Sequence, residues 1–175
     1  MRLFFALWPD AGERAALDAA TRAALHATRG RAIPRENLHV TLAFLGSVPE
    51  DRVAGLRAVA LSVRIAPFVL VLERLAHFAR ARVLAAMPAG EPAALLALTA
   101  QLRERLGAAG FPTDPRPFRA HLTLAREVAQ PLEDQHMTAV ALRCASFALV
   151  ESRTERTGAL YSVIDAWPLD DAKNT

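Results

Sequence analysis

Two short runs of this sequence place a histidine and a threonine two residues apart. They are His39-Val40-Thr41 and His121-Leu122-Thr123, and Leu-Ala follows each of them. In an extended strand, side chains two apart lie on the same face, so each run can present an imidazole and a hydroxyl together. Two such strands could bring two imidazoles to one site. One neutral and one protonated imidazole supply the base and the acid for catalysis at a phosphodiester near neutral pH.

The other three histidines lack this context. His26 and His136 also begin a His-x-Thr tripeptide, but His26 lies in a predicted helix, where positions two apart do not share a face. His136 follows three polar residues and lacks the long alternating flank of a strand. His77 has no hydroxyl residue two positions on, and we expect a surface or structural role for it. For His39 and His121, the competing interpretation is a histidine hydrogen-bonded within a sheet; their shared flanks favour a common site.

Paired histidines also bind metals. Carboxylates are scarce near both runs, and no Cys/His cluster has the spacing of a zinc site. We therefore expect neither a metal nor another cofactor. The only lysine is Lys173, in a polar tail, and no glycine-rich phosphate loop is present. This argues against an ATP-driven ligase that forms a lysine adenylate.

Three helices are predicted around these runs. Asp10 and Glu13 resemble a capping box that opens a helix over residues 10–30, with Gly30 closing it in the left-handed conformation. Ser47 and Glu50 frame a second capping box, for a helix that reaches about residue 64. A third helix over residues 92–109 begins at a proline and carries a stripe of leucines: Leu95, Leu98, Leu102 and Leu106.

Short apolar segments rich in branched or aromatic residues predict strands. Besides the opening residues 1–8 and the two histidine runs, they are residues 68–72, 82–86, 146–150 and 160–164. Prolines make residues 112–117 an extended loop before His121, and polar residues 130–135 are typical of a turn. Each half of the chain carries a helix followed by a His-x-Thr strand, which is a weak internal duplication.

Composition sets the broad class. The chain has 175 residues, of which 53% are hydrophobic, and its composition shows no break. This favours a single domain that spans residues 1–175. Pro9 and Asp10 interrupt the apolar start, and no apolar stretch reaches the roughly 20 residues that span a bilayer, so we expect a cytoplasmic protein. Cys144 lies in an apolar run and is expected to be a buried structural thiol. A net charge of +3 permits a polyanionic partner.

The residues around the two motifs resemble a known family. Residues 38–46 (LHVTLAFLG), 116–126 (RPFRAHLTLAR) and 2–7 (RLFFAL) are similar to the bacterial RNA 2′,3′-cyclic phosphodiesterases. These enzymes are also called the 2′-5′ RNA ligase family, of the two-histidine phosphoesterase superfamily. Residues 161–169 fit as well, so the likeness covers nearly the whole chain. It implies an α+β fold of two pseudo-symmetric lobes, each a small antiparallel sheet with helices on its outer face, and a central cleft that carries both motifs.

The resemblance also implies roles. His39 becomes the proton donor and His121 the proton acceptor in a metal-independent hydrolysis of an RNA-terminal 2′,3′-cyclic phosphate to a 2′-phosphate. Thr41 and Thr123 could hydrogen-bond the non-bridging oxygens of the phosphate. With a 5′-hydroxyl in place of water, the reversed reaction joins RNA ends through a 2′-5′ linkage without ATP. The expected partners are RNA 3′ ends or nucleotides with a cyclic phosphate, and we expect a monomer.

Three further positions depart from simple strand alternation or from the family pattern. Arg126 is a substrate-binding candidate by resemblance, yet strict alternation from His121 would point it to the opposite face unless the strand bulges. Phe44 has the same parity and is more typical of a core residue than of a base-stacking one. Ala85 stands where the family often has tryptophan, which argues against an aromatic base contact there.

Two alternatives remain open. The same chemistry could act on a small cyclic phosphate, such as a nucleotide or an ADP-ribose derivative. A module that binds RNA ends or nucleotides without turning them over also fits, since the calculated pI is about 9.9 and no third residue clearly tunes the histidines.

Overall fold

The computed structural model describes residues 1–155 and 158–171, so Lys173 lies outside the described residues. The helices and strands, in chain order, are β1 (Arg2–Leu7), α1 (Ala11–Thr28), β2 (Arg31–Ala32), β3 (Val40–Ser47), α2 (Val53–Ser62), β4 (Phe68–Phe78), β5 (Val83–Met87), α3 (Ala93–Ala108), β6 (Leu122–Arg126), β7 (Gln135–Cys144), β8 (Ser146–Glu155) and β9 (Gly158–Pro168). Three short 3-10 turns, at Arg35–Asn37, Glu50–Arg52 and Ala79–Ala81, link some of them.

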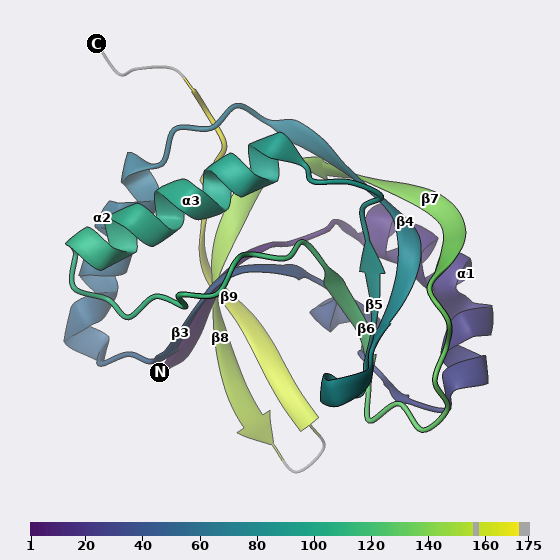
Figure 1. Cartoon of the computed structure of the whole chain (residues 1–175). Helices are drawn as coiled ribbons and strands as arrows, with labels where there is room; N and C mark the ends of the chain where they lie inside the picture. The colour runs from purple at the N-terminus through teal and green to yellow at the C-terminus, as the bar shows by residue number, and fades with distance from the viewer. Residues whose placement is uncertain (156–157, 172–175) are drawn as a thin grey trace.

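The strands form two antiparallel sheets. Their orders are β3-β1-β8-β9 and β2-β6-β5-β4-β7, so each His-x-Thr strand belongs to a different sheet. Helix α1 packs on the second sheet through β7 and β6, whereas α3 contacts β3 and α2 packs on α3. Figure 1 shows α1 on one flank of the molecule and α2 and α3 on the other. The expected α+β architecture of two antiparallel sheets with flanking helices is confirmed.

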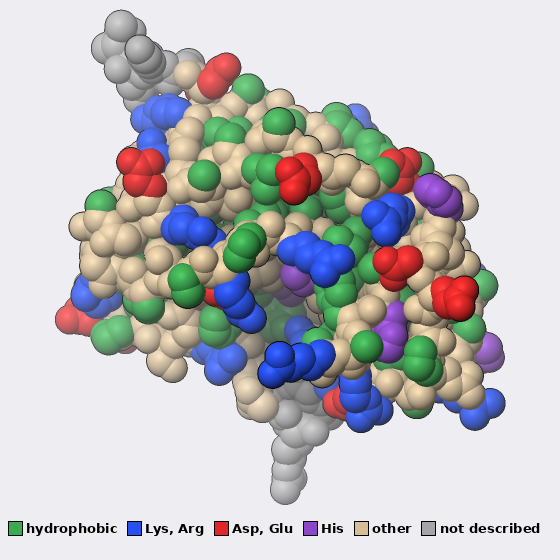
Figure 2. All heavy atoms as spheres, viewed as in Figure 1, with side chains coloured by type: hydrophobic (Ala, Val, Ile, Leu, Met, Phe, Trp, Pro, Cys, Tyr) green, Lys and Arg blue, Asp and Glu red, His purple; other side chains and the backbone are tan. Residues whose placement is uncertain are grey.

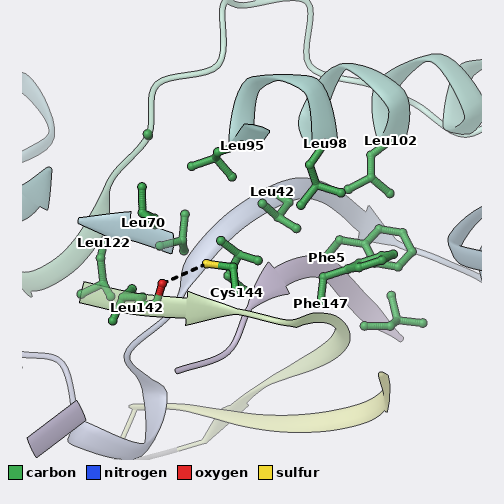
Figure 3. Packing of buried hydrophobic residues seen from close by; sticks show 14 of the residues in the cluster. Phe5, Leu42, Leu70, Leu95, Leu98, Leu102, Leu122, Leu142, Cys144 and Phe147 are labelled. Carbon is green, nitrogen blue, oxygen red and sulfur yellow. Dashed lines mark hydrogen bonds between the residues drawn. The ribbon is translucent and has the colours of Figure 1, made fainter. Parts of the chain in front are cut away.

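A single cluster of buried side chains joins the two sheets. The four leucines of the predicted stripe on α3 are fully buried in it, together with Phe5 of the first sheet and Leu70 of the second. In Figure 3, Leu95, Leu98 and Leu102 point from α3 toward Leu42. Full burial of each such side chain contributes roughly 1.5–3 kcal/mol. This shared core holds the two motif strands in a fixed relation.

Cys144 ends β7 inside the same cluster. Its side chain is buried and free of any disulfide, and its thiol donates to the Leu142 carbonyl at 3.6 Å (Figure 3). Burial raises the pKa of the thiol to about 12, so it stays protonated at neutral pH. The predicted buried structural cysteine is confirmed.

Helix α1 begins as predicted but ends differently. The Asp10 carboxylate accepts from the Glu13 backbone N–H at 2.8 Å, and the Glu13 carboxylate accepts from the Asp10 N–H at 2.9 Å. The left-handed residue at the C-terminus is Arg29 rather than Gly30. Gly30 instead allows a close approach to β6, because a Cβ there would lie 3.1 Å from the Arg126 carbonyl oxygen. No helix among the described residues is long and apolar enough to cross a membrane.

The second predicted capping box is wrong. Ser47 is the last residue of β3 and pairs with Arg2 of β1, so its backbone is extended. Pro49 then leads into the 3-10 turn Glu50–Arg52, and α2 starts only at Val53 without a side-chain cap. Pairing in the sheet therefore overrides the local capping signal.

The strand predictions were too few and too short. β4, β8 and β9 each extend several residues beyond the predicted segments, and β2 and β7 were missed. β7 was missed because its first half is polar and exposed, and only from Val140 onward do buried residues alternate with exposed ones. A polar strand is stabilised by its pairing with β4, which residue type alone does not indicate.

Candidate active site

His39 stands directly before β3, after the turn Arg35–Asn37. Its Nδ1 lies 2.6 Å from the Asn37 carbonyl oxygen, and its Nε2 lies 3.0 Å from Thr41 Oγ1. A carbonyl can only accept, so Nδ1 carries the proton and donates it. In the neutral ring, Nε2 is then an acceptor, to which the Thr41 hydroxyl donates. The imidazole and the hydroxyl thus share one strand face, as the motif predicted.

His121 is held in a similar way directly before β6. Its Nδ1 donates to the Arg119 carbonyl oxygen at 2.7 Å, which is again the carbonyl two residues earlier. This bond leaves Nε2 available for proton transfer. The edge of the ring contacts Phe78, with centroids 5.5 Å apart and planes at 84°. The local backbone therefore orients both histidines in the same way.

One cleft collects residues from both motifs. It has a volume of about 700 Å³, and Thr41 of β3 lines it together with His121 and Arg126. The rest of its wall comes from α3 and the loop before His121. Figure 2 shows this face hollowed, with a histidine inside the hollow and several Lys or Arg side chains around it. His39 reaches the cleft through Thr41, whose hydroxyl it contacts.

Aromatic rings surround His39. Trp8 stacks on the imidazole at 5.6 Å and 21°, Phe4 lies at 4.9 Å, and Tyr161 of β9 meets the ring edge-on at 5.3 Å. This enclosure lowers the pKa of His39 to about 4, because burial penalises the charged form. The hydrogen bond to Asn37 opposes the shift.

Charged neighbours also change the pKa of His39. Arg126, His121 and Arg14 each lower its pKa further, because a second positive charge nearby disfavours the imidazolium. Because Arg126 and His121 act electrostatically on His39, these two side chains of the second motif lie near the imidazole of the first motif. The free protein therefore holds His39 neutral at pH 7.

Arg126 reaches the cleft because β6 bulges. Ala85 pairs with Thr123 and Leu84 pairs with Ala125, so Leu124 is an extra residue without a partner. The bulge reverses the alternation and returns Arg126 to the face of Thr123. Arg126 accordingly lines the cleft.

The same bulge occurs in β3, and it corrects the expectation for Phe44. Ala6 pairs with Thr41 and Phe5 pairs with Ala43, so Leu42 is the extra residue. Phe44 is therefore not a core residue. Its side chain is 49% exposed and lines the cleft, with the Arg2 guanidinium 4.8 Å from its ring centroid. Phe44 and Arg126 hold equivalent places in the two motifs.

Thr123 and Ala85 are neighbours across the β5–β6 pair. Thr123 is half-buried and shares a strand face with His121 by alternation. Ala85 is fully buried opposite it, so this position offers no surface to a base.

The other histidines lie elsewhere. His26 is exposed on α1, as predicted, and His136 is exposed on β7, where it pairs with Arg74. His77 is half-buried on β4, and its Nε2 has no hydrogen-bond partner among the described residues. Within residues 1–155 and 158–171, no group of three or more His, Cys, Asp or Glu side chains comes together that could hold a metal ion.

Several residues near the site were not predicted. Trp8 and Tyr161 enclose His39, and Arg103 and Arg119 line the cleft. Trp8 is the last residue of the predicted first strand, and Arg119 lies two residues before His121, so the sequence weakly indicated both. Arg103 and Tyr161 lie on elements far from the motifs in sequence, and only the fold brings them near.

Comparison with known proteins gives consistent matches. An RNA 2′,3′-cyclic phosphodiesterase from Thermus thermophilus is 34% identical over 97% of this chain and 90% of its own length. The Escherichia coli K12 protein of the same name is 34% identical, over 58% of this chain and 57% of its own length. The crystal structure of E. coli LigT complexed with 3′-AMP superposes with a TM-score of 0.86 at 29% identity, covering 96% of this chain and 97% of that one.

A family model joins these observations. The model of the 2′-5′ RNA ligase superfamily matches residues 8–155, which include both His-x-Thr strands and the cleft between them. The chain therefore belongs to the 2′-5′ RNA ligase superfamily.

Proposed function

We propose that this protein hydrolyses the 2′,3′-cyclic phosphate at an RNA 3′ end to a 2′-phosphate, without a metal ion. The observation that carries the proposal is the matched pair of imidazoles, each held by a bond from Nδ1 to the carbonyl two residues earlier. Both adjoin one cleft that also holds Arg126. The name shared by the relatives, RNA 2′,3′-cyclic phosphodiesterase, supports the same reaction.

Each histidine moves one proton. Neutral His121 accepts a proton at Nε2 from the water that attacks phosphorus, and the bond between phosphorus and the 3′ oxygen breaks. Protonated His39 donates from Nε2 to the departing 3′ oxygen, which leaves the phosphate on the 2′ oxygen. Exchange with solvent then restores both rings.

His39 must first gain its proton, since its pKa of about 4 keeps it neutral in the free protein. A phosphate anion beside the ring raises the pKa, because an opposite charge favours the imidazolium. Once Nε2 carries a proton, it no longer accepts from Thr41. The Thr41 hydroxyl is then free to donate to a phosphate oxygen.

Arg126 is the phosphate-binding side chain in this proposal. It lines the cleft beside His121, and a guanidinium can donate two parallel hydrogen bonds to phosphate oxygens. The Thr123 hydroxyl donates to a non-bridging phosphate oxygen beside His121, as the Thr41 hydroxyl does beside His39. These donors hold the phosphorus between the rings.

The wall of the cleft favours RNA over a small cyclic nucleotide. Arg103, Arg116 and Arg119 line the cleft beyond His121, and the one carboxylate among the lining residues, Asp114, is paired with Arg116. Positive side chains that continue past the reacting phosphate suit the backbone of a longer strand. The exposed Phe44 ring at the same cleft can stack on a base. One chain supplies both histidines, so we propose that the enzyme acts as a monomer, and we place it in the cytoplasm.

The direct test uses purified protein in EDTA. RNA ending in a 2′,3′-cyclic phosphate should yield a 2′-phosphate end, whereas no product, or a 3′-phosphate only, contradicts the proposal. Oligonucleotides should give a higher kcat/KM than cyclic mononucleotides, and the reverse would identify a small-nucleotide phosphodiesterase. Binding without turnover would identify a binding module. With a 5′-hydroxyl RNA as the second substrate, the same site should form a 2′-5′ linkage without ATP.

A further inference from the structure

Arg14 and His39 both contact the indole ring of Trp8. The Arg14 guanidinium, from the first turn of α1, lies 4.9 Å from the ring centroid of Trp8. Trp8 in turn stacks on His39 at 5.6 Å. These two contacts in series place the cation within about 11 Å of the imidazole. Arg14 is one of the groups whose charge acts on His39.

Arg14 is poorly compensated by hydrogen bonds. Its Nε and Nη2 atoms are buried and have no partner among the described residues. Asp10 and Glu13 are close enough to act on its charge, but their carboxylates bond backbone N–H groups of the capping box and of Arg143. A buried donor without a partner costs free energy, so its presence calls for a reason.

Among the residues that the structure describes, three charged groups act on His39. They are Arg126 and His121 from the second motif and Arg14 from α1, and all of them are basic. The aromatic contacts of the ring are Phe4 and Trp8, at β1, and Tyr161, on β9. Glu36 acts on Arg14, together with the two capping carboxylates. His39 therefore sits in a positive environment before any substrate enters.

We propose that Arg14 is a positioning residue for His39: it holds the Trp8 ring against the imidazole and keeps a permanent positive charge nearby. The empty site then disfavours protonated His39, and the ring takes up its proton only when an anionic phosphate enters. The inference rests on the proposed role of His39 in hydrolysis. The proposed role explains why the Arg14 guanidinium is buried: its charge makes the protonation of His39 depend on the bound substrate.

The test is the titration of His39 in the free protein, followed by NMR of its imidazole nitrogens. Arg14→Met should raise the pKa of His39 by about half a unit to one unit, as expected for loss of one charge at this distance. At pH 5 the ratio of protonated to neutral ring should then rise about 3- to 10-fold. Arg14→Lys keeps the charge and should restore most of the wild-type value. Arg22→Met, an exposed position on the same helix, is the matched control and should leave the titration unchanged.

A second variant guards against misfolding. Trp8→Leu removes the ring on which Arg14 packs, and it should move the pKa of His39 in the same direction as Arg14→Met. An unmoved titration in Arg14→Met overturns the inference even if Trp8→Leu moves it, because loss of the indole also exposes the imidazole; identical behaviour of Arg14→Met and Arg14→Lys overturns it as well. This readout needs no substrate, so it stands apart from the test of cyclic phosphate hydrolysis.

Kinetics give an independent arm. In Arg14→Met, the midpoint of the pH–kcat limb that follows His39 should move to higher pH by the same amount, with KM at the optimum near the wild-type value. A purely structural role would lower kcat at every pH and leave the midpoints in place, and that result would count against the proposal.

Discussion

In both His-x-Thr strands the imidazole Nδ1 donates to the carbonyl two residues earlier, at 2.6 Å for His39 and 2.7 Å for His121. Both strands also insert one extra leucine directly after the threonine. The two halves of the site thus share the hydrogen bond that orients the histidine and the bulge that follows the threonine. Similar local sequence patterns produced the same histidine anchor and the same bulge in two different sheets.

The surroundings of the two rings differ. Three aromatic residues enclose His39, whereas His121 contacts the edge of Phe78 and lines the open cleft. An arginine packs on an aromatic neighbour of each histidine, but Arg14 is partly buried and Arg119 is exposed in the cleft. The His39 ring is therefore the more enclosed of the two, whereas the His121 ring lines the cleft.

The equivalent positions after each bulge also differ. Phe44 presents an apolar ring to the cleft, and Arg126 presents a guanidinium. In the proposed mechanism the Phe44 ring stacks on a base and the Arg126 guanidinium binds the phosphate, although both side chains owe their direction to the same bulge. The comparison shows that the shared bulge sets the direction of each side chain, whereas the residue type sets which chemical group the cleft receives.

The largest expected effect is the loss of either imidazole. His39→Ala and His121→Ala should each lower kcat by about 10²–10⁴-fold, the range for removal of a general acid or base. Single-turnover hydrolysis of cyclic-phosphate RNA measures this, with binding checked separately. His26→Ala and His136→Ala, whose side chains are exposed outside the cleft, should stay active. A dead His136→Ala with an active His121→Ala would refute the pairing of the motifs.

The enclosure of His39 also predicts an acid-sensitive fold. The unfolded chain binds a proton at this residue near pH 6.5, but the folded chain does so only near pH 4. Between these values the unfolded state holds more protons, so the free energy of unfolding falls as the pH drops, by about 3 kcal/mol in total. Urea unfolding of wild type and His39→Gln at pH 7.5 and pH 4.5 should show a smaller acid loss in the variant. His26→Gln should keep the wild-type loss, and equal losses in all three proteins would mean that His39 is not enclosed.

The two post-bulge positions should respond differently. Arg126→Met should lower kcat/KM about 10- to 100-fold for both mononucleotide and oligonucleotide substrates, because it removes charged hydrogen bonds to the phosphate. Phe44→Leu should cost about 5- to 10-fold, through weaker stacking on a base. Steady-state kinetics on adenosine 2′,3′-cyclic phosphate and on a cyclic-phosphate-ended oligonucleotide separate the two. A larger loss in Phe44→Leu would reverse the division of work argued above.

The smallest effect concerns the support of the second bulge. In Gly30→Ala the added Cβ would press on the Arg126 carbonyl and on Val128 at 3.1 Å, so the free energy of unfolding should fall by about 1 kcal/mol. Gly107→Ala, on α3 with open space around the position, should raise it by about 0.5–1 kcal/mol. Thermal unfolding of both variants measures the contrast, and a stabilised Gly30→Ala would show that β2 and β6 can move apart.

The sequence alone determined the features that depend on neighbouring residues. Alternation placed His39 with Thr41 and His121 with Thr123, the Asp10 capping box started α1, and the leucine stripe identified the buried face of α3. Each follows from strand or helix geometry over a few residues, which the local sequence controls.

Only the tertiary structure decided the rest. The direction of Phe44 and Arg126 depends on an extra residue in the pairing with β1 and β5, and a register between strands cannot be read from one strand. The low proton affinity of His39 depends on Trp8, Tyr161 and Arg14, which come from three separate segments. Burial is the sum of contacts between distant parts of the chain. The motif could therefore identify the two histidines, but it could not predict the enclosure that makes the surroundings of His39 differ from those of His121.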